Sequence, residues 1–220
     1  MSIKNVIAYE VPTLDPSDTG DKVLQLMDDN NLGQLPVVVK EQYVALVQES
    51  DLLDWETPEQ PISASDFLRY SPAVFVENHP YEALKLAYNQ NLSVIPVVNG
   101  ENVYQGAATR ESLLKFLMEG SGLEGPGGIL VLEMKPIDYS LYEIARICES
   151  EDVAILGTRL FSNTETGNIE LTIKTNRTNL DALANSYERF GYTVKELYGE
   201  HSDKDNLIDR YNLLMTYINM

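Results

Sequence analysis

The sequence predicts an α/β (α+β) protein made of three small units. An eight-residue phrase occurs twice, as NLGQLPVV over residues 31–38 and as NLSVIPVV over residues 91–98. A segment with five glycines and one proline, residues 118–128, then separates these repeats from a further alternation of strands and helices. We therefore expect two βαββα units packed as a pair, followed by a βαββαβ unit and a C-terminal helix.

The first copy of the repeat is expected to contain strand, helix, strand, strand and helix. A short strand follows Pro12, and Pro16 precedes a helix, because the fixed φ of proline suits the first helical turn. A buried strand, QLPVVV, and a return strand from Tyr43 complete the sheet. The apolar face of the first helix is marked at a spacing of three to four residues by Val23, Leu24 and Met27.

The second copy repeats this order, with Pro96 standing 60 positions after Pro36. The pair Asn99-Gly100 predicts a type I′ hairpin turn, and the return strand begins at Tyr104. One such unit leaves an apolar face uncovered, whereas two copies can cover each other.

This pattern resembles a cystathionine-β-synthase (CBS) domain pair, also called a Bateman module. The resemblance rests on the order of the elements, on the LPVV and IPVV strands, and on the motif that follows them. That motif consists of glycine, two apolar residues, Thr, two further residues and Asp. The resemblance covers about residues 5–118. We assign residues 1–60 to the first CBS unit, 61–118 to the second and 119–128 to a glycine-rich linker.

Residues 129–200 are expected to form the third unit. The strands read ILVLEMK, VAILGTRLF, NIELTIKT and YTVKELY, with one helix over residues 139–151 and another from Asp181. The order βαββαβ predicts a ferredoxin-like sheet with both helices on one face. This unit resembles an ACT domain, a ligand-sensing module of amino-acid metabolism. A CBS pair followed by an ACT domain is similar to the acetoin-utilisation family of regulatory proteins.

Residues 201–220 predict an amphipathic helix with Ser202 as its N-cap. This helix packs either on its own sheet or against a second copy of the chain. Its apolar stripe consists of Leu207, Tyr211, Leu214, Met215 and Ile218.

The composition excludes several classes of partner. A net charge of −18 repels nucleic acid and anionic membranes. No apolar run approaches the ~18 residues of a membrane span, and the first residues lack the features of a secretory signal, so we expect a cytoplasmic protein. The only cysteine, Cys148, is expected to be a buried small hydrophobe.

No pattern supports catalysis, a metal site or a bound cofactor, and we expect a protein that is not an enzyme. His79 and His201 lie far apart in the sequence, and the chain has neither a GxxxxGK nor a GxGxxG phosphate loop. The many carboxylates are typical of a solvated surface.

The CBS resemblance implies an adenosine-binding motif in each copy. Its final carboxylate would accept hydrogen bonds from ribose hydroxyls, and a Ser or Thr three residues earlier would hold phosphate at a helix start. The first motif, residues 45–51, keeps Asp51 but has Gln48 at the hydroxyl position. The second, residues 106–112, keeps Gly106 and Thr109 but has Ser112 at the carboxylate position. Neither motif is complete.

Each candidate residue also has a structural alternative. Thr109 can cap the following helix, and Asp51 in a first helical turn interacts favourably with the helix dipole. Arg110 is the only base within the two motifs and favours AMP over ATP. In the ACT-like unit, Tyr139 stands near the position of a ligand-approaching glycine, and Asp138 is either an N-cap or a ligand group.

Two functions follow from these patterns. The first is a regulatory or sensor protein, a homodimer whose CBS pair binds AMP, ATP or another adenosine derivative and signals to an unidentified protein target through a population shift. The second is an interaction and assembly protein with degenerate CBS and ACT units that bind no ligand.

Overall fold

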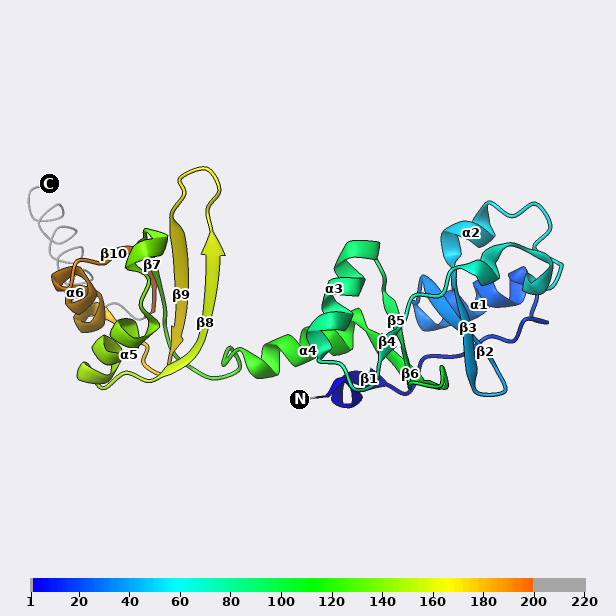
Figure 1. The fold of residues 1–220 in the computed structure, drawn as a ribbon, viewed down its shortest axis with the longest axis horizontal. Coiled ribbons are helices and arrows are strands. Elements are labelled where there is room, and N and C mark those ends of the chain that lie inside the picture. The colour runs from blue at the N-terminus through cyan, green and yellow to red at the C-terminus, as the bar shows by residue number, and fades with distance from the viewer. Residues whose placement is uncertain (1, 200–220) are drawn as a thin grey trace, which may run out of the picture. The chain divides into compact units, whose positions relative to one another are not determined.

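The structure, a computed structural model, describes residues 2–199 (Figure 1). These residues form two compact units that divide between Leu117 and Met118. The amphipathic helix predicted for residues 201–220 lies outside the described residues. Within residues 2–199, every helix is too short or too polar to span a bilayer.

The first unit contains both copies of the repeat. The chain opens with a short 3-10 helix, η1 (Ile3–Val6), and a strand, β1 (Ile7–Ala8). Two further 3-10 helices, η2 (Ile62–Ala64) and η3 (Phe67–Arg69), connect the copies. The first copy consists of α1 (Gly20–Asn30), β2 (Gln34–Val39), β3 (Gln42–Gln48) and α2 (Glu49–Leu53). The second copy consists of β4 (Val74–Phe75), α3 (Pro80–Gln90), β5 (Val94–Val98), β6 (Tyr104–Thr109) and α4 (Arg110–Gly120).

The two copies share the same strand register, so the predicted duplication is confirmed. Leu14 pairs in parallel with Val37, and Val74 pairs in parallel with Val97, 60 positions later in each case. Both hairpins carry an irregularity at the same place, immediately after these two valines. Helices α1 and α3 both end at an asparagine with φ 53° and ψ 40°, a left-handed conformation that asparagine tolerates.

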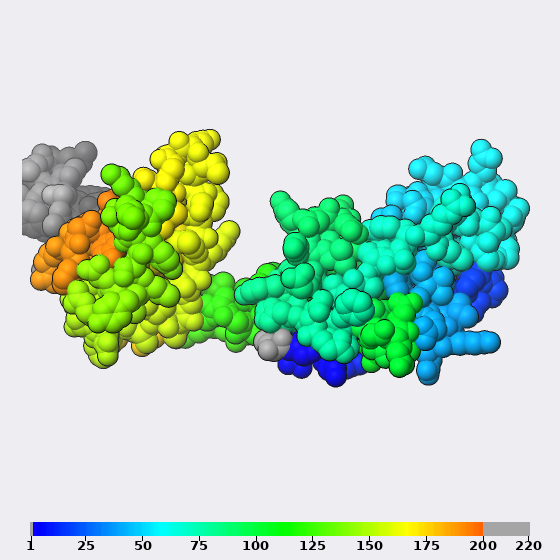
Figure 2. Space-filling view, viewed as in Figure 1, coloured from blue at the N-terminus to red at the C-terminus, as the bar shows by residue number. Residues whose placement is uncertain are grey.

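The leading segment of each copy packs against the other copy. Strand β1 pairs antiparallel with β6, where Ile7 lies opposite Ala108, giving the sheet order β1-β6-β5-β4. In return, the carbonyl oxygen of Tyr70 accepts a hydrogen bond of 2.8 Å from the amide of Leu46 in β3. Figure 2 shows the dark-blue start of the chain against the green residues of the second copy. Neither copy therefore completes its sheet alone.

The two hairpins also meet each other. The rings of Tyr43 and Tyr104, at equivalent positions, stack with centroids 6.5 Å apart. The amide of Tyr104 donates to the carbonyl of Glu41 at 2.7 Å. The Tyr43 hydroxyl donates to the Pro72 carbonyl at 2.9 Å, whereas the buried Tyr104 hydroxyl has no partner within residues 2–199. Burial raises the pKa of Tyr104 to about 12, so its phenol is neutral at physiological pH.

The predicted type I′ turn at Asn99-Gly100 is wrong. Type I′ needs positive φ at both central residues, and in this loop only Asn102 has one, of 61°. The side chain of Asn99 instead accepts hydrogen bonds from two amides of the loop. Two consecutive positive φ values, as a type I′ turn needs, occur instead in the hairpin of the first copy, at Lys40 (49°) and Glu41 (71°).

The second unit confirms the βαββαβ order and the predicted ferredoxin-like sheet. The strands are antiparallel in the order β10-β7-β9-β8. Residues of alternate strand positions, such as Leu132 and Leu171, form one core with Ile144 and Tyr187 of the helices. Cys148 is buried in this core, as expected. The elements are β7 (Ile129–Met134), η4 (Pro136–Asp138), α5 (Leu141–Ser150), β8 (Ile155–Ser162), β9 (Ile169–Thr175), α6 (Asp181–Arg189) and β10 (Thr193–Tyr198).

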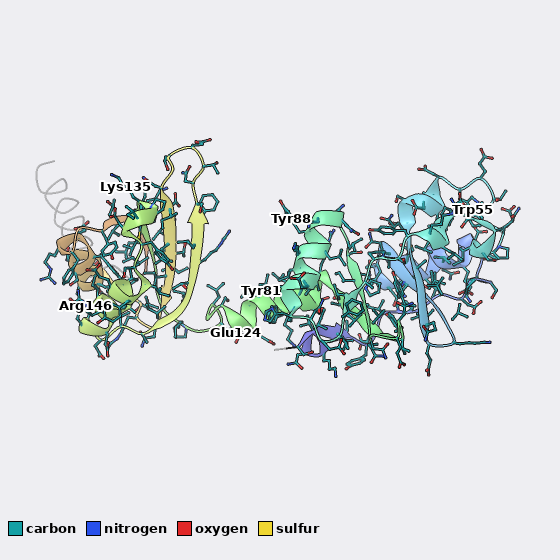
Figure 3. The ribbon with its side chains drawn as sticks, in the orientation of Figure 1. Trp55, Tyr81, Tyr88, Glu124, Lys135 and Arg146 are labelled. Atoms are coloured by element: carbon teal, nitrogen blue, oxygen red, sulfur yellow. The ribbon has the colours of Figure 1, made fainter. Side chains whose placement is uncertain are left out.

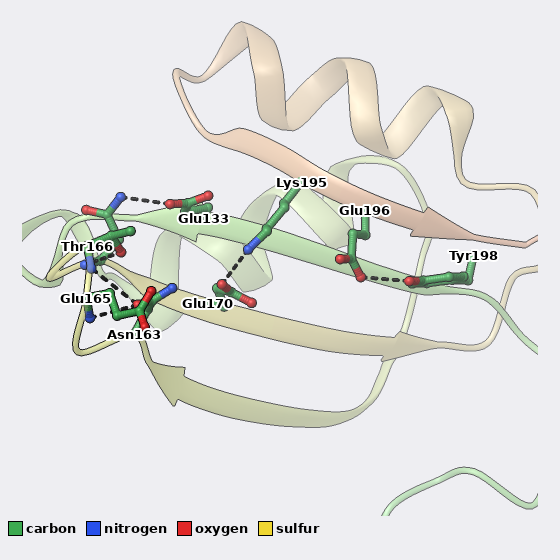
Figure 4. Close-up of polar contacts among 9 residues, drawn as sticks. Glu133, Asn163, Glu165, Thr166, Glu170, Lys195, Glu196 and Tyr198 are labelled. Atoms are coloured by element: carbon green, nitrogen blue, oxygen red, sulfur yellow. Dashed lines mark hydrogen bonds and ion pairs between the residues drawn. The ribbon is translucent and has the colours of Figure 1, made fainter.

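The other face of this sheet, which we call the open face, carries polar side chains. Lys195 donates to Glu170 at 2.5 Å, and Asn168 donates to Glu133 at 2.8 Å (Figure 4). This alternation of apolar and polar residues is typical of an antiparallel sheet covered by helices on one side.

Replacing Gly106 with alanine is expected to destabilise the first unit. Gly106 has φ 126°, and a Cβ there would lie 2.4 Å from the Ile7 Cγ2 atom of β1. The strained backbone and the clash together cost about 1–3 kcal/mol. Urea unfolding followed by the fluorescence of Trp55, the only tryptophan, measures this loss.

Gly100→Ala is the matched control, because a Cβ at Gly100 would meet nothing within 4 Å. An equal stability for the Gly106→Ala and Gly100→Ala proteins would contradict the close approach of β1.

Candidate functional site

The carboxylate of the first motif opens onto a cavity. Asp51 lies in the first turn of α2 and is half-buried. It lines a cavity of about 570 Å³ together with residues from the end of α2 and from the segment around η3. Trp55, labelled in Figure 3, belongs to this group. The full lining consists of Asp51, Asp54, Trp55, Asp66, Phe67, Arg69 and Tyr70.

The other residues of the cavity are held by aromatic contacts and by the second copy. Phe67 meets Trp55 edge to face, with ring centroids 5.2 Å apart and an angle of 83°. The Tyr70 hydroxyl donates a hydrogen bond of 2.7 Å to the side chain of Gln90 in α3. The backbone of Tyr70 is at the same time bonded to β3. The cavity thus depends on the packing of one copy against the other.

The cavity is acidic. Arg69 is its only base, and it forms a 2.8 Å ion pair with Asp66 in which both side chains are exposed. No residue within 2–199 donates a hydrogen bond to the Asp51 carboxylate. Burial, and then the negative charge of Asp51, raise the pKa of Tyr70, so this phenol remains a hydrogen-bond donor at neutral pH. Asp51 can therefore accept hydrogen bonds from a ligand's hydroxyls, beside aromatic rings that can stack on a flat group.

Gln48, at the hydroxyl position of the first motif, does not line this cavity. Its side-chain oxygen accepts a weak hydrogen bond of 3.4 Å from Gln34. The oxygen of Gln34, which is only 7% exposed, accepts a 2.7 Å bond from the amide of Ser93 in the second copy. Gln48 and Gln34 thus form a polar bridge between the two copies.

The two hydroxyls of the second motif each bond to the backbone of the other residue. The Thr109 side chain accepts a hydrogen bond of 3.1 Å from the amide of Ser112, and the Ser112 side chain accepts one of 2.9 Å from the amide of Thr109. This reciprocal arrangement caps the start of α4. Gly106, further up the strand, is covered by Ile7 of β1. The second motif therefore serves its own fold.

Arg110 is also engaged in the protein. Its Nε donates to the carbonyl of Leu92 at 2.9 Å, and a terminal nitrogen donates to the Asn91 side chain at 2.7 Å. The guanidinium thus bonds to the cap residue of α3, Asn91, and to the residue that follows it. Arg110 does not belong to the lining of the Asp51 cavity.

Sequence reasoning missed the aromatic residues of the cavity and the polar bridge between the two copies. Trp55 follows Asp51 by one helical turn and, as the only tryptophan, offered a signal. For the bridge, the available signal was Gln34, a polar residue in a buried strand at the position where the second copy has Val94. Nothing in the sequence indicated that Tyr70 lies beside Asp51.

The ACT-like unit has a cavity of about 840 Å³ at the start of α5. Asp138 lines it, whereas the N-cap of α5 is Ser140, whose side chain accepts from the amide of Glu143 at 3.3 Å. The interpretation of Asp138 as the N-cap is therefore wrong. Tyr139 does not belong to the lining, so its ring does not fill this cavity. Glu133, Asp138 and Glu143 make the cavity acidic.

A comparison with known protein families identifies the first copy of the repeat. Residues 3–57 match the family model of the CBS domain. A CBS domain pair/ACT domain protein of Thermotoga maritima is 22% identical over 54% of this chain and 98% of its own, with a TM-score of 0.49. CBSX2 of Arabidopsis thaliana, in complex with AMP, is 20% identical over 54% and 96%, with a TM-score of 0.48. The CBS domains of a transcriptional regulator of Streptococcus pneumoniae are 18% identical over 52% and 98%, with a TM-score of 0.46.

The family match confirms the CBS resemblance for the first copy, and the second copy repeats its elements in the same register. The assignment of the third unit as an ACT domain, and of the chain to the acetoin-utilisation family, stays a prediction.

Replacing Thr109 with valine is expected to lower the free energy of unfolding of the first unit by about 1 kcal/mol, because the amide of Ser112 loses its acceptor. Urea unfolding read by Trp55 fluorescence measures the change. Thr13→Val, at an exposed position, is the control, with an expected change within about 0.5 kcal/mol. Equal effects of the two substitutions would contradict the capping role.

Proposed function

We propose that the first unit is a regulatory CBS pair that binds an adenosine-containing ligand beside Asp51 and catalyses no reaction. The observation that carries this proposal is the Asp51 carboxylate, which accepts no hydrogen bond within residues 2–199 and faces a cavity with aromatic walls. A carboxylate that accepts hydrogen bonds from both ribose hydroxyls is a common means of binding a nucleoside. The proposal includes a homodimer in the cytoplasm that acts on a separate protein target.

The size and walls of the cavity fit a nucleoside. Small-molecule sites usually enclose about 300–1,000 Å³, and this cavity, of about 570 Å³, falls within that range. Trp55, Phe67 and Tyr70 supply rings on which a base can stack, an interaction that tolerates any base but favours flat ones.

The charge of the cavity favours a ligand with few negative charges. Asp51, Asp54 and Asp66 outnumber Arg69, which is already paired with Asp66. A triphosphate would add negative charge beside these carboxylates with no free base to balance it. Among adenosine compounds, the charge of the cavity therefore favours adenosine and the cationic S-adenosylmethionine over AMP, and AMP over ATP.

A ligand in this cavity can act through the contact between the copies. Tyr70 joins the cavity wall to β3 through its backbone and to α3 through its hydroxyl. A ligand that packs against Tyr70 interacts differently with different arrangements of the two copies, and such a difference is the requirement for a population shift.

A second candidate function is assembly without a ligand. The closed pair of Thr109 and Ser112, and the engagement of Arg110 by Asn91, favour it, because the second motif is occupied by its own fold. This candidate predicts that no adenosine compound binds to the first unit.

Fluorescence titration of Trp55 separates the two functions, since this side chain lines the cavity and is the only tryptophan. Adenosine, S-adenosylmethionine, AMP and ATP are titrated at constant ionic strength. We expect adenosine or S-adenosylmethionine to change the fluorescence with a lower Kd than ATP. Asp51→Asn is expected to raise this Kd at least tenfold, because charge-assisted hydrogen bonds are lost.

Asp28→Asn is the matched control, an identical change at an exposed position of α1, and should leave the Kd within twofold. A lower Kd for ATP than for adenosine would contradict the charge argument. No response to any of the four compounds would leave assembly as the function.

A further inference from the structure

The segment that precedes β7 crosses the open face of the second unit's sheet. A Cβ on Gly157 of β8 would lie 2.5 Å from the carbonyl oxygen of Ser121, and one on Gly122 would lie 2.7 Å from the Cβ of Leu156. These glycines allow the segment to lie directly on the strand. A cavity of about 310 Å³ remains beside the crossing, lined among others by Ser121, Leu123, Ile129, Arg159, Thr172 and Lys174.

One wall of this cavity is a buried lysine. Lys174 is 8% exposed, and its ammonium group donates a 2.6 Å hydrogen bond to the carbonyl of Gly127. Within residues 2–199, Lys174 has no carboxylate partner. An ammonium group has three donors, so the bond to Gly127 leaves two of them for a further acceptor. Such a group favours a nearby anion.

A second base lies on the neighbouring strand. Arg159 of β8 stands opposite Thr172 in the register, next to Lys174 on the same face. No ion pair involves Arg159 within residues 2–199. The guanidinium can form two parallel hydrogen bonds with a carboxylate or a phosphate.

The cavity is locally positive in an acidic chain. Among the described residues, its lining has two bases and no carboxylate, whereas the whole chain has 34 acidic and 16 basic residues. Glu170, further along β9 on the same face, is bonded to Lys195 (Figure 4). Its charge is therefore balanced by a base outside the cavity.

We infer that this cavity binds a small organic anion, a carboxylate or a phosphate monoester. The anionic group lies between Arg159 and Lys174, and the apolar part packs on Leu123 and Ile129. The volume is close to the lower end of the range of small-molecule sites, which limits the ligand to a few ring-sized groups. This site is separate from the Asp51 cavity and does not depend on the function proposed above.

The bound anion would also fix the crossing segment. Lys174 holds this segment through Gly127, and Ser121 and Leu123 of the same segment line the cavity. A ligand therefore contacts the sheet and the segment at once, which makes the segment's attachment sensitive to the anion.

Isothermal titration calorimetry of the full chain with three probes tests this inference. Phenyl phosphate and benzoate represent the two kinds of anion, and benzyl alcohol presents a ring without charge. We expect at least one anion to bind with one site per chain and benzyl alcohol to bind at least tenfold more weakly. The anion that binds more tightly identifies the ligand class.

Variants locate the binding site. Arg159→Gln and Lys174→Met should each raise the Kd of the anion at least tenfold, because each removes a charge-assisted hydrogen bond. Arg159 is exposed, so its variant keeps the fold even if Lys174→Met loosens the segment. Arg146→Gln in α5, beyond the other face of the sheet, removes the same charge and should change the Kd less than twofold.

Any of the following results would overturn the inference. One is that neither anion binds at millimolar concentration. Another is that benzyl alcohol binds as tightly as the anions. A further one is that Arg159→Gln changes the Kd no more than Arg146→Gln does. Asp51→Asn should leave the Kd of the anion unchanged. A weakening there would place the probe in the first unit and would likewise refute the inference.

Discussion

The first unit depends on the exchange of leading segments between the two copies. A βαββα repeat has an exposed sheet edge and an uncovered apolar face, both of which favour association with another chain. Here β1 pairs with β6, and the segment around Tyr70 bonds to β3, so each copy supplies what the other lacks. The duplication is therefore a single folded body with one shared interface. The Asp51 cavity exists because of this exchange, since part of its lining belongs to the segment that crosses between the copies.

The two copies have nearly the same backbone but different local chemistry. The same strand-to-helix junction carries Asp51 in one copy and Ser112 in the other. Ser112 completes a pair of hydrogen bonds with Thr109, which stabilises its own helix. Within residues 2–199 Asp51 has no such partner, and the side chain of Gln48 instead accepts a hydrogen bond from Gln34. The Ser112 position therefore stabilises its own helix, whereas the Asp51 carboxylate keeps its capacity to accept hydrogen bonds.

Net charge describes this protein poorly at the scale of its cavities. A charge of −18 predicts repulsion of anions over the surface as a whole. The Asp51 cavity agrees with that expectation, with three carboxylates against one paired arginine. The cavity on the open face differs, because Arg159 and Lys174 meet there without a carboxylate. Short-range pairing, rather than the total charge, sets the local charge of each cavity.

The repeated phrase and the short-range alternation of apolar and polar residues made much of the fold predictable. The phrases around Pro36 and Pro96 established the duplication, and the order of strands and helices after residue 128 established the βαββαβ sheet. Local turn geometry was less predictable. The Asn99 side chain accepts hydrogen bonds from the amides of its loop, which the Asn-Gly pair did not indicate. Ser140 rather than Asp138 caps α5.

By itself, then, the sequence determined the units, their elements and which half of each motif survives, because these features depend on residues close together in the chain. Only the tertiary structure decided which side chains meet. Tyr70 lies beside Asp51, Arg110 bonds to Asn91, and Arg159 stands next to Lys174. These contacts join residues distant in the chain, and their formation depends on how strands pair and how the copies exchange segments. No periodicity in the sequence records that information.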